Sequence, residues 1–242
     1  MHGAAIKYNG GVSVTDKAVL YVTGYALLFL LFGVMWLAVF FRGGLTGRKT
    51  IYLSAISTGA LAFILALSIQ TPIQIYANNF FSGRGASLWT TGAIVVLISG
   101  LVQEAFKGLA IWLNRFIMRE EIDWLSLGLA VGFGFGVWEA WRLVAYELGR
   151  HSIWFPLAIM ERFTAIGLHI GLAFIVAYGL SKRQPWRYFL LAAVWHGAVN
   201  YLVVCYQGRL FGIWPTEIGS LIMALAAVIF ASWLYRRPQP TD

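Results

Sequence analysis

The sequence LLAAVWHGAVNYLVV, from Leu190 to Val204, is apolar except for His196 and Asn200. It lies within an apolar segment of about 20 residues, the length that an α-helix needs to cross the hydrocarbon core of a bilayer. Residues four positions apart share one face of a helix, so the imidazole and the carboxamide would lie together. The segment therefore predicts a membrane-spanning helix that carries one polar stripe.

Apolar segments of this length recur along the chain of 242 residues, which is 60% hydrophobic and 12% charged. That composition is too apolar for a soluble globular domain. No segment shows the alternation of polar and apolar residues that the strands of an outer-membrane barrel require. The sequence predicts an all-α, polytopic helical bundle in the cell membrane, with a single integral membrane domain over residues 1–242. We expect seven spans, at about 18–41, 51–69, 90–113, 124–147, 153–180, 187–206 and 215–235.

The basic residues indicate the orientation of the chain. Of the 18 Lys and Arg, ten fall in loops on one side of the predicted spans and five on the other. The positive-inside rule then places the N-terminus outside and the C-terminus in the cytoplasm. Membrane topology also accounts for the net charge of +8, so the bilayer is an expected partner and nucleic acid is not. Cys205 is the single cysteine, which excludes an internal disulfide and a Cys-rich zinc site.

Charged residues inside the predicted spans are the strongest sign of function. An unpaired charge at the bilayer centre costs at least ~2.5–3.5 kcal/mol, so interior charges are usually paired. Glu104 and Lys107 are three positions apart, as are Glu139 and Arg142, and each pair shares a helix face. We expect both pairs to face the interior of the bundle.

The next two predicted spans carry polar stripes as well. Arg162 and His169 are two helical turns apart, and His196 and Asn200 are one turn apart. Glu161 is adjacent to Arg162 and is expected to point elsewhere. Four consecutive antiparallel spans thus each carry one polar stripe, which predicts a shared buried polar pocket between them.

Two further patterns concern the helices themselves. Gly128, Gly132 and Gly136 repeat every four residues, a small-residue stripe that lets a neighbouring backbone approach closely. The segment 70–89 contains Pro, Asn and Gly and is predicted to be the longest outside loop.

A buried glutamate beside two histidines could bind a divalent metal such as zinc, because Glu and His are ordinary zinc ligands. The candidate ligands are Glu139, His169 and His196. A metal in this position would polarise a carbonyl group and activate a water.

The same residues could also work without a metal. Glu104 would be the general base for a water, with Lys107 beside it. His196 and Asn200 would donate hydrogen bonds to the developing oxyanion. Either chemistry predicts hydrolysis of a carbonyl compound, a peptide bond above all, inside the membrane.

The order of motifs along the spans resembles the type II CAAX prenyl endopeptidase and bacteriocin-immunity clan of intramembrane proteases, in its PrsW-like and YhfC-like branch. The resemblance covers about residues 100–204. The motifs read QEAFK (Gln103–Lys107), GFGFGVWEA (Gly132–Ala140), ERFTAIGLHIGLAF (Glu161–Phe174) and WHGAVN (Trp195–Asn200).

The resemblance implies a role for each matching residue. Glu104 would activate water with Lys107 as its basic partner, and membrane-embedded proteins would be the substrates. The other implied active-centre residues are Glu139, His169, His196 and Asn200. The clan usually has two adjacent acids in the first motif, whereas this chain has Gln103 before Glu104; Gln103 can hydrogen-bond but cannot serve as a base.

Other classes of protein remain in view. A retinal protein is disfavoured because the last predicted span lacks a lysine for a Schiff base. A transporter or proton relay would use the same buried polar groups, although the sequence shows no inverted repeat. A haem held by His169 and His196 and a catalytically inactive membrane scaffold are the remaining alternatives.

Overall fold

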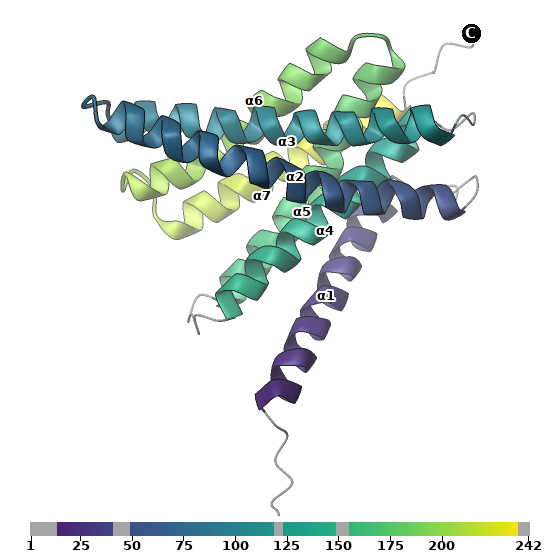
Figure 1. The fold of residues 1–242 in the computed structure, drawn as a ribbon, viewed down its shortest axis with the longest axis horizontal. Coiled ribbons are helices and arrows are strands. Elements are labelled where there is room, and N and C mark those ends of the chain that lie inside the picture. Colours follow the sequence, from purple (N-terminus) through teal and green to yellow (C-terminus); the bar gives the residue numbers. More distant parts are fainter. Residues whose placement is uncertain (1–13, 41–48, 119–122, 149–154, 237–242) are drawn as a thin grey trace, which may run out of the picture.

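The computed structural model describes residues 14–40, 49–118, 123–148 and 155–236, and these residues form seven α-helices (Figure 1). Each predicted span corresponds to one helix, so the all-α prediction is confirmed. The helices are α1 (Val14–Ala38), α2 (Lys49–Ser82), α3 (Leu88–Met118), α4 (Trp124–Leu148), α5 (Phe155–Ser181), α6 (Pro185–Gln207) and α7 (Ile213–Arg236).

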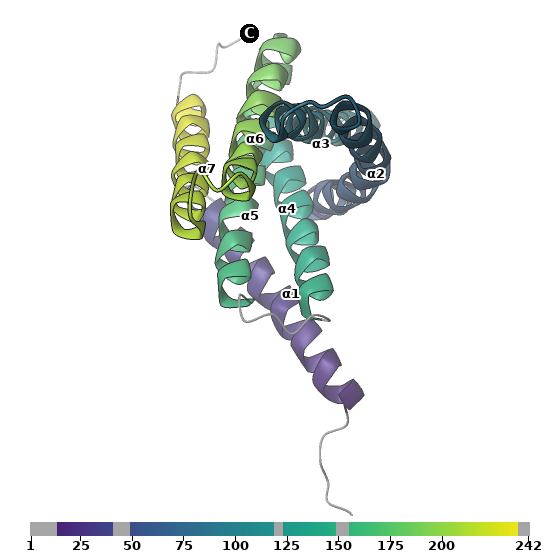
Figure 2. The same ribbon diagram turned by 90° about the vertical axis from the view of Figure 1, so that its left-hand side faces the viewer.

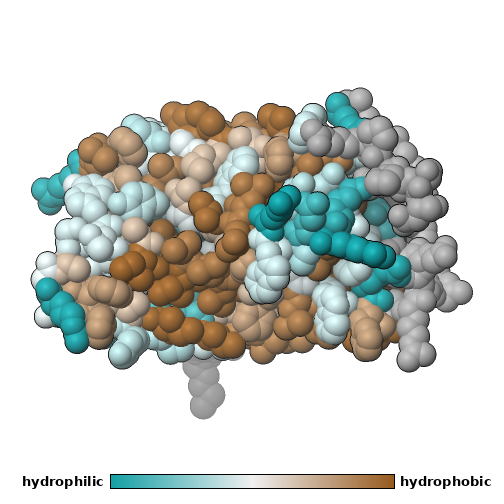
Figure 3. All heavy atoms as spheres, turned by 90° about the horizontal axis from the view of Figure 1, so that it is seen from above, coloured by the Kyte–Doolittle hydropathy of each residue, from teal (hydrophilic) through white to brown (hydrophobic). Residues whose placement is uncertain are grey.

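Within the described residues, six helices are long and apolar enough to cross a membrane; the exception is α4, which carries Glu139 and Arg142. Helices suit this environment because they satisfy their own backbone hydrogen bonds where no water is available. Large apolar side chains such as Leu27, Ile117 and Ile229 lie exposed on the outside, and apolar residues cover much of the face in Figure 3. The chain is thus a multi-pass membrane protein.

The orientation stays a prediction. The predicted cytoplasmic segments 42–48 and 119–122 and the predicted outside segment 149–154 lie outside the described residues.

The helices form two groups. In Figure 1, α2 and α3 lie side by side, and α4 and α5 cross them at a steep angle. Figure 2 shows α4 and α5 next to each other, with α7 on the far side of α5. Helix α5 contacts α1, α3, α4, α6 and α7 and is the most buried of the candidate spans. The core of the protein therefore lies around α5.

The predicted loop at 70–89 is largely helical. Helix α2 continues through Pro72 to Ser82, and only residues 83–87 separate it from α3. Two amides stabilise this extension: Gln70 Nε2 donates to Ser99 Oγ at 3.1 Å, and Gln74 Nε2 donates to the carbonyl oxygen of Val95 at 2.9 Å. The prediction was wrong because contacts with α3 outweigh the local preference of these polar residues for a loop.

The glycine stripe on α4 packs closely against a neighbouring helix, as predicted, and the structure shows that this helix is α5. A Cβ atom on Gly132 would lie 2.7 Å from the carbonyl oxygen of His169 and 2.8 Å from Cα of Ile170. On Gly136 it would lie 3.1 Å from Cα of Ile166. The two backbones can therefore approach only because these positions lack side chains. This close packing brings His169 next to α4.

Candidate active site

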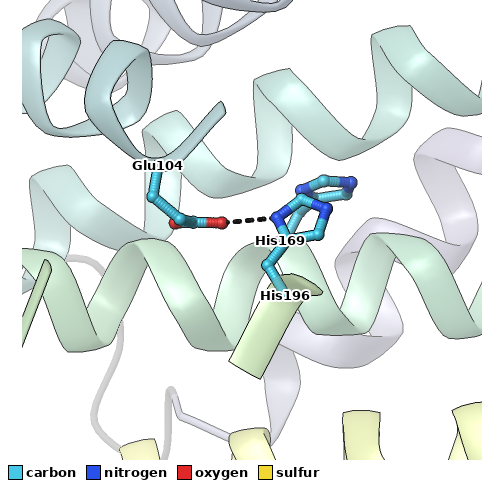
Figure 4. Close-up of side chains that lie close together, drawn as sticks. All are labelled: Glu104, His169 and His196. Carbon is cyan, nitrogen blue, oxygen red and sulfur yellow. Dashed lines mark hydrogen bonds and ion pairs between the residues drawn. The ribbon is translucent and has the colours of Figure 1, made fainter. Parts of the chain in front are cut away.

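Five buried or half-buried side chains from four helices form one continuous chain of polar contacts. Oε1 of Glu104 lies 2.6 Å from Nζ of Lys107 and 2.7 Å from Nδ1 of His196. Nζ of Lys107 also lies 3.2 Å from Nδ1 of His169, whose Nε2 pairs with Oε2 of Glu139. Figure 4 shows Glu104 and the two histidines converging from α3, α5 and α6. The structure thus brings together two carboxylate–histidine pairs, with Lys107 between them.

Burial makes these contacts necessary. The side chains of Glu104 and Lys107 are 0% exposed, and a buried charge without a partner is strongly destabilising. Lys107 therefore stabilises Glu104, as its spacing in the sequence predicted. Phe135 supports the cluster: its ring centre lies 5.2 Å from Nζ of Lys107 and 4.9 Å from the imidazole of His169.

The hydrogen-bond partners indicate which ring nitrogen of each histidine carries a hydrogen. An ammonium can only donate, so Nδ1 of His169 accepts from Lys107, and Nε2 carries the hydrogen that faces Glu139. An ionised carboxylate can only accept, so Nδ1 of His196 donates to Glu104. In a neutral His196 the lone pair is then on Nε2, for which the described residues offer no hydrogen-bond partner.

A cavity of about 460 Å³ lies beside this cluster. Most of the predicted site residues line it: Gln103, Glu139, Arg142, Arg162, His169, His196 and Asn200. Glu104 and Lys107 do not line it and lie behind its wall. The predicted shared pocket therefore exists, but of the two carboxylates in the cluster it is Glu139, with its side chain 16% exposed, that lines the cavity, and not Glu104.

Two expected pairings differ from the structure. Glu139 pairs with His169 across the α4–α5 contact, while Arg142, its expected partner on the same helix, is exposed and lines the cavity. Glu161 was expected to point away but forms an ion pair with Arg162 and lines the same cavity. Spacing along one helix revealed shared faces; it could not reveal which neighbouring helix offers a nearer partner.

Sequence reasoning missed several polar residues at the cavity or near it, including Thr164 and Ser220, which line it. Gln70 was assigned to a loop, and Ser99 is a small hydroxyl in an apolar span; both line the cavity. Glu217 on α7 interacts electrostatically with Glu161 and Arg162. Its position inside the last predicted span was the available signal.

The residues present fit a divalent metal. The carboxylate of this ligand set is Glu104 and not the expected Glu139: donor atoms of Glu104, His169 and His196 lie within 4.8 Å of one another, and Oε2 of Glu104 is buried without a hydrogen-bond partner. One carboxylate and two imidazoles form a ligand set that is found at catalytic zinc. Glu139 pairs with the outer nitrogen of His169, the place of a carboxylate that orients a metal-bound histidine. In this structure Lys107 contacts two of the three donors, so its ammonium lies where a metal would bind.

The haem alternative does not fit. The rings of His169 and His196 are in edge contact, with centres 5.2 Å apart and an interplanar angle of 72°. A porphyrin has no room between two imidazoles in contact, and both Nδ1 atoms already have partners.

The fold and the cluster define a class: multi-pass helical membrane proteins with a buried Glu/His site. Comparison with known proteins narrows this class. A family model described as "YhfC intramembrane metalloprotease" matches residues 144–218. The uncharacterized membrane protein YhfC of Bacillus subtilis (strain 168) is 23% identical over an alignment of 236 residues. The match covers 83% of this chain and 84% of that protein.

The chain is therefore similar to YhfC, and this similarity agrees with the branch that its motifs resemble. The segment matched by the family model contains His169, His196 and Asn200, whereas Glu104 and Glu139 precede it. No solved structure matches the chain.

Proposed function

We propose that this protein hydrolyses peptide bonds of membrane-embedded proteins in the cavity between its helices. The observation that carries the proposal is the pair of Glu–His contacts at one cavity wall: Glu104 with His196, and Glu139 with His169. Hydrolysis requires one group to remove a proton from water and a group to return a proton to the leaving amine. The family description of an intramembrane metalloprotease supports the same reaction class.

His196 is the proposed base. Its Nδ1–H is bonded to Glu104, so the lone pair on Nε2 is available to a water in the cavity. Glu104 is fully enclosed, so it acts through His196: it fixes the orientation of the ring and stabilises the imidazolium that forms. The sequence suggested that Glu104 itself deprotonates the water. The enclosed position of Glu104 makes it a positioning residue instead, because a base must touch the proton that it removes.

The reaction then proceeds in two steps. Nε2 of His196 takes a proton from water while the water oxygen bonds to the carbonyl carbon, and the carbonyl oxygen becomes an oxyanion. The amide of Asn200, one turn along α6 on the same cavity wall, donates a hydrogen bond to that oxyanion. The C–N bond breaks, and the imidazolium of His196 gives its proton to the leaving nitrogen.

A metal is the open alternative for activating the water. Glu104, His169 and His196 would hold it, and it would supply a more acidic water and Lewis-acid polarisation of the carbonyl group. Glu139 would keep its place against His169 in either case. The metal-dependent arrangement requires Lys107 to release the donor atoms that it now contacts.

A proton relay is the second candidate, because the contacts from His196 through Glu104, Lys107 and His169 to Glu139 are continuous. The two ends of this chain, however, line the same cavity. A relay across the membrane would connect opposite sides, so the geometry favours hydrolysis. Proton-dependent uptake into proteoliposomes that survives Glu104→Gln would instead support a transporter.

New protein N-termini test the proposal without knowledge of the substrate. Membranes from cells that lack the protein are incubated with purified wild type or with His196→Ala, and new N-termini are identified by mass spectrometry. We expect new termini within or beside membrane spans only with the wild type. Identical sets of termini from both proteins would contradict the proposal and favour an inactive scaffold.

A further inference from the structure

A second wall of the cavity is built from uncharged amides. Gln103 Nε2 donates to Oε1 of Gln70 at 3.0 Å and approaches Oγ of Ser99 at 3.2 Å. Nε2 of Gln70 and Nδ2 of Asn200 lie 3.1 and 3.3 Å from the same hydroxyl oxygen. All four residues line the cavity, and they come from α2, α3 and α6. This amide wall (Gln70, Ser99, Gln103 and Asn200) lies at the same cavity as the charged residues of α4 and α5.

Gln103 is the incomplete member of the amide wall. Its side chain is almost fully buried, at 6% exposure, and its Oε1 atom has no hydrogen-bond partner among the described residues. A buried acceptor that lacks a donor is unfavourable, so such an atom on a residue that lines a cavity marks a place for a ligand that donates. Exchanging the two ends of the amide would leave a donor unpaired instead, so the amide of Gln103 stays incomplete in either orientation.

A peptide backbone is the ligand with matching chemistry. A membrane-embedded substrate must unwind where it is cut, and its freed N–H and C=O groups have no water to bond in the bilayer core. A carboxamide offers the same donor and acceptor as a peptide group. Four amide or hydroxyl groups on one wall can therefore replace the helical hydrogen bonds that an unwound segment loses.

We propose that the amide wall binds the unwound backbone of the substrate, with Gln103 accepting a hydrogen bond from a backbone N–H. This inference rests on the proposed function. Gln103, where the resembling clan usually has a second acid, is then a specificity residue of this chain. It holds the peptide bond beside His196, and an uncharged amide avoids the cost of burying another carboxylate next to Glu104.

Binding of a defined probe tests the inference separately from cleavage. The probe is a fluorescent transmembrane peptide of leucine and alanine, roughly 25 residues long, with a Gly-Pro centre that weakens its helix. The full chain carries His196→Ala so that the probe is not consumed, and affinity is measured in nanodiscs. Gln103→Met is compared with Gln74→Met; Gln74 also bonds Gln70 and the backbone of α3 but does not line the cavity. Thermal unfolding establishes that each variant is folded.

We expect Gln103→Met to weaken binding about 3- to 10-fold, the effect of one hydrogen bond, and Gln74→Met to leave it unchanged. A probe with N-methylated residues at its centre lacks the N–H donor and should bind the two Gln103 forms equally. Equal loss in the two glutamine variants, absence of probe binding, or wild-type Gln103 binding both probes alike would overturn the inference. Probe binding as predicted without any proteolysis would support the amide wall and contradict the proposed peptidase function. Proteolysis by a protein whose probe binding does not depend on Gln103 would support the peptidase function and contradict the amide wall.

Discussion

His196 on α6 donates from Nδ1 to Oε1 of Glu104 on α3 at 2.7 Å, across 92 positions of the sequence. The contact joins a fully enclosed carboxylate to an imidazole that lines the cavity. Glu104 therefore polarises an imidazole at the cavity surface, although the carboxylate itself is not exposed.

Lys107 should be the main stabilising partner of Glu104. Replacing Lys107 with Met leaves a buried carboxylate without its cation, and we expect a loss of about 3–5 kcal/mol in the free energy of unfolding. Unfolding in mixed micelles measures the change. Glu104→Leu combined with Lys107→Met should recover most of the loss, since both charges are then absent. Arg187→Met, at an exposed position, is the control and should change stability by less than about 0.5 kcal/mol. A single Lys107 variant as stable as the control would contradict the ion pair.

The same lysine should limit the affinity for metal. Its ammonium lies 2.6 Å from Oε1 of Glu104 and 3.2 Å from Nδ1 of His169, so a divalent cation must displace it. We expect Lys107→Met to bind zinc at least about tenfold more tightly than the wild type, as measured by equilibrium dialysis with elemental analysis. His169→Ala in the Lys107→Met background should abolish the gain. Equal zinc affinity with and without Lys107 would show that the ammonium does not compete for these donors.

The contact between α4 and α5 should tolerate no side chain at Gly132. Gly132→Ala places a methyl group 2.7 Å from the carbonyl oxygen of His169, and we expect a loss of about 1–3 kcal/mol of stability. Gly24→Ala is the matched control, because nothing lies within 4 Å of the new methyl group. That control should be neutral or stabilising by up to about 1 kcal/mol, since alanine favours helix. Similar effects at both positions would contradict the close packing.

The predicted orientation can be tested with single cysteines in a Cys205→Ala background. Arg84 lies in the exposed turn before α3, and Gln184 precedes α6 on the opposite side of the predicted topology. A membrane-impermeant thiol reagent added to intact cells should label Arg84→Cys and not Gln184→Cys. Labelling of Gln184→Cys alone would show that the chain has the opposite orientation.

The sequence was informative about faces and uninformative about partners. Helical spacing placed Glu104 with Lys107 correctly, because both residues lie on one helix. It could not reveal that Glu139 pairs with His169 and not with Arg142, since that contact depends on how closely α4 approaches α5. The glycine stripe predicted a close approach but did not identify the partner helix.

The amide wall shows a second limit of sequence reasoning. Gln70 and its neighbours near Pro72 have the composition of a loop, and their helical state depends on hydrogen bonds to α3. The enclosure of Glu104 was equally hidden, because spacing shows which residues share a stripe but not which one reaches the cavity. The packing of α2, α3 and α6 determines that Glu104 lies behind the cavity wall and that His196 lines it.

The rate of substrate cleavage by wild type, Glu104→Gln and His196→Ala tests the central claim most directly. The substrate is one identified by its new N-terminus, reconstituted with the protein in nanodiscs, and each reaction is run with and without a chelator. We predict that both variants are at least about 100-fold slower than the wild type, whereas Gln74→Met is not. Loss of wild-type activity with the chelator would show that a metal activates the water. Retained activity would show that His196 activates it. Cleavage by both variants at the wild-type rate would contradict the account.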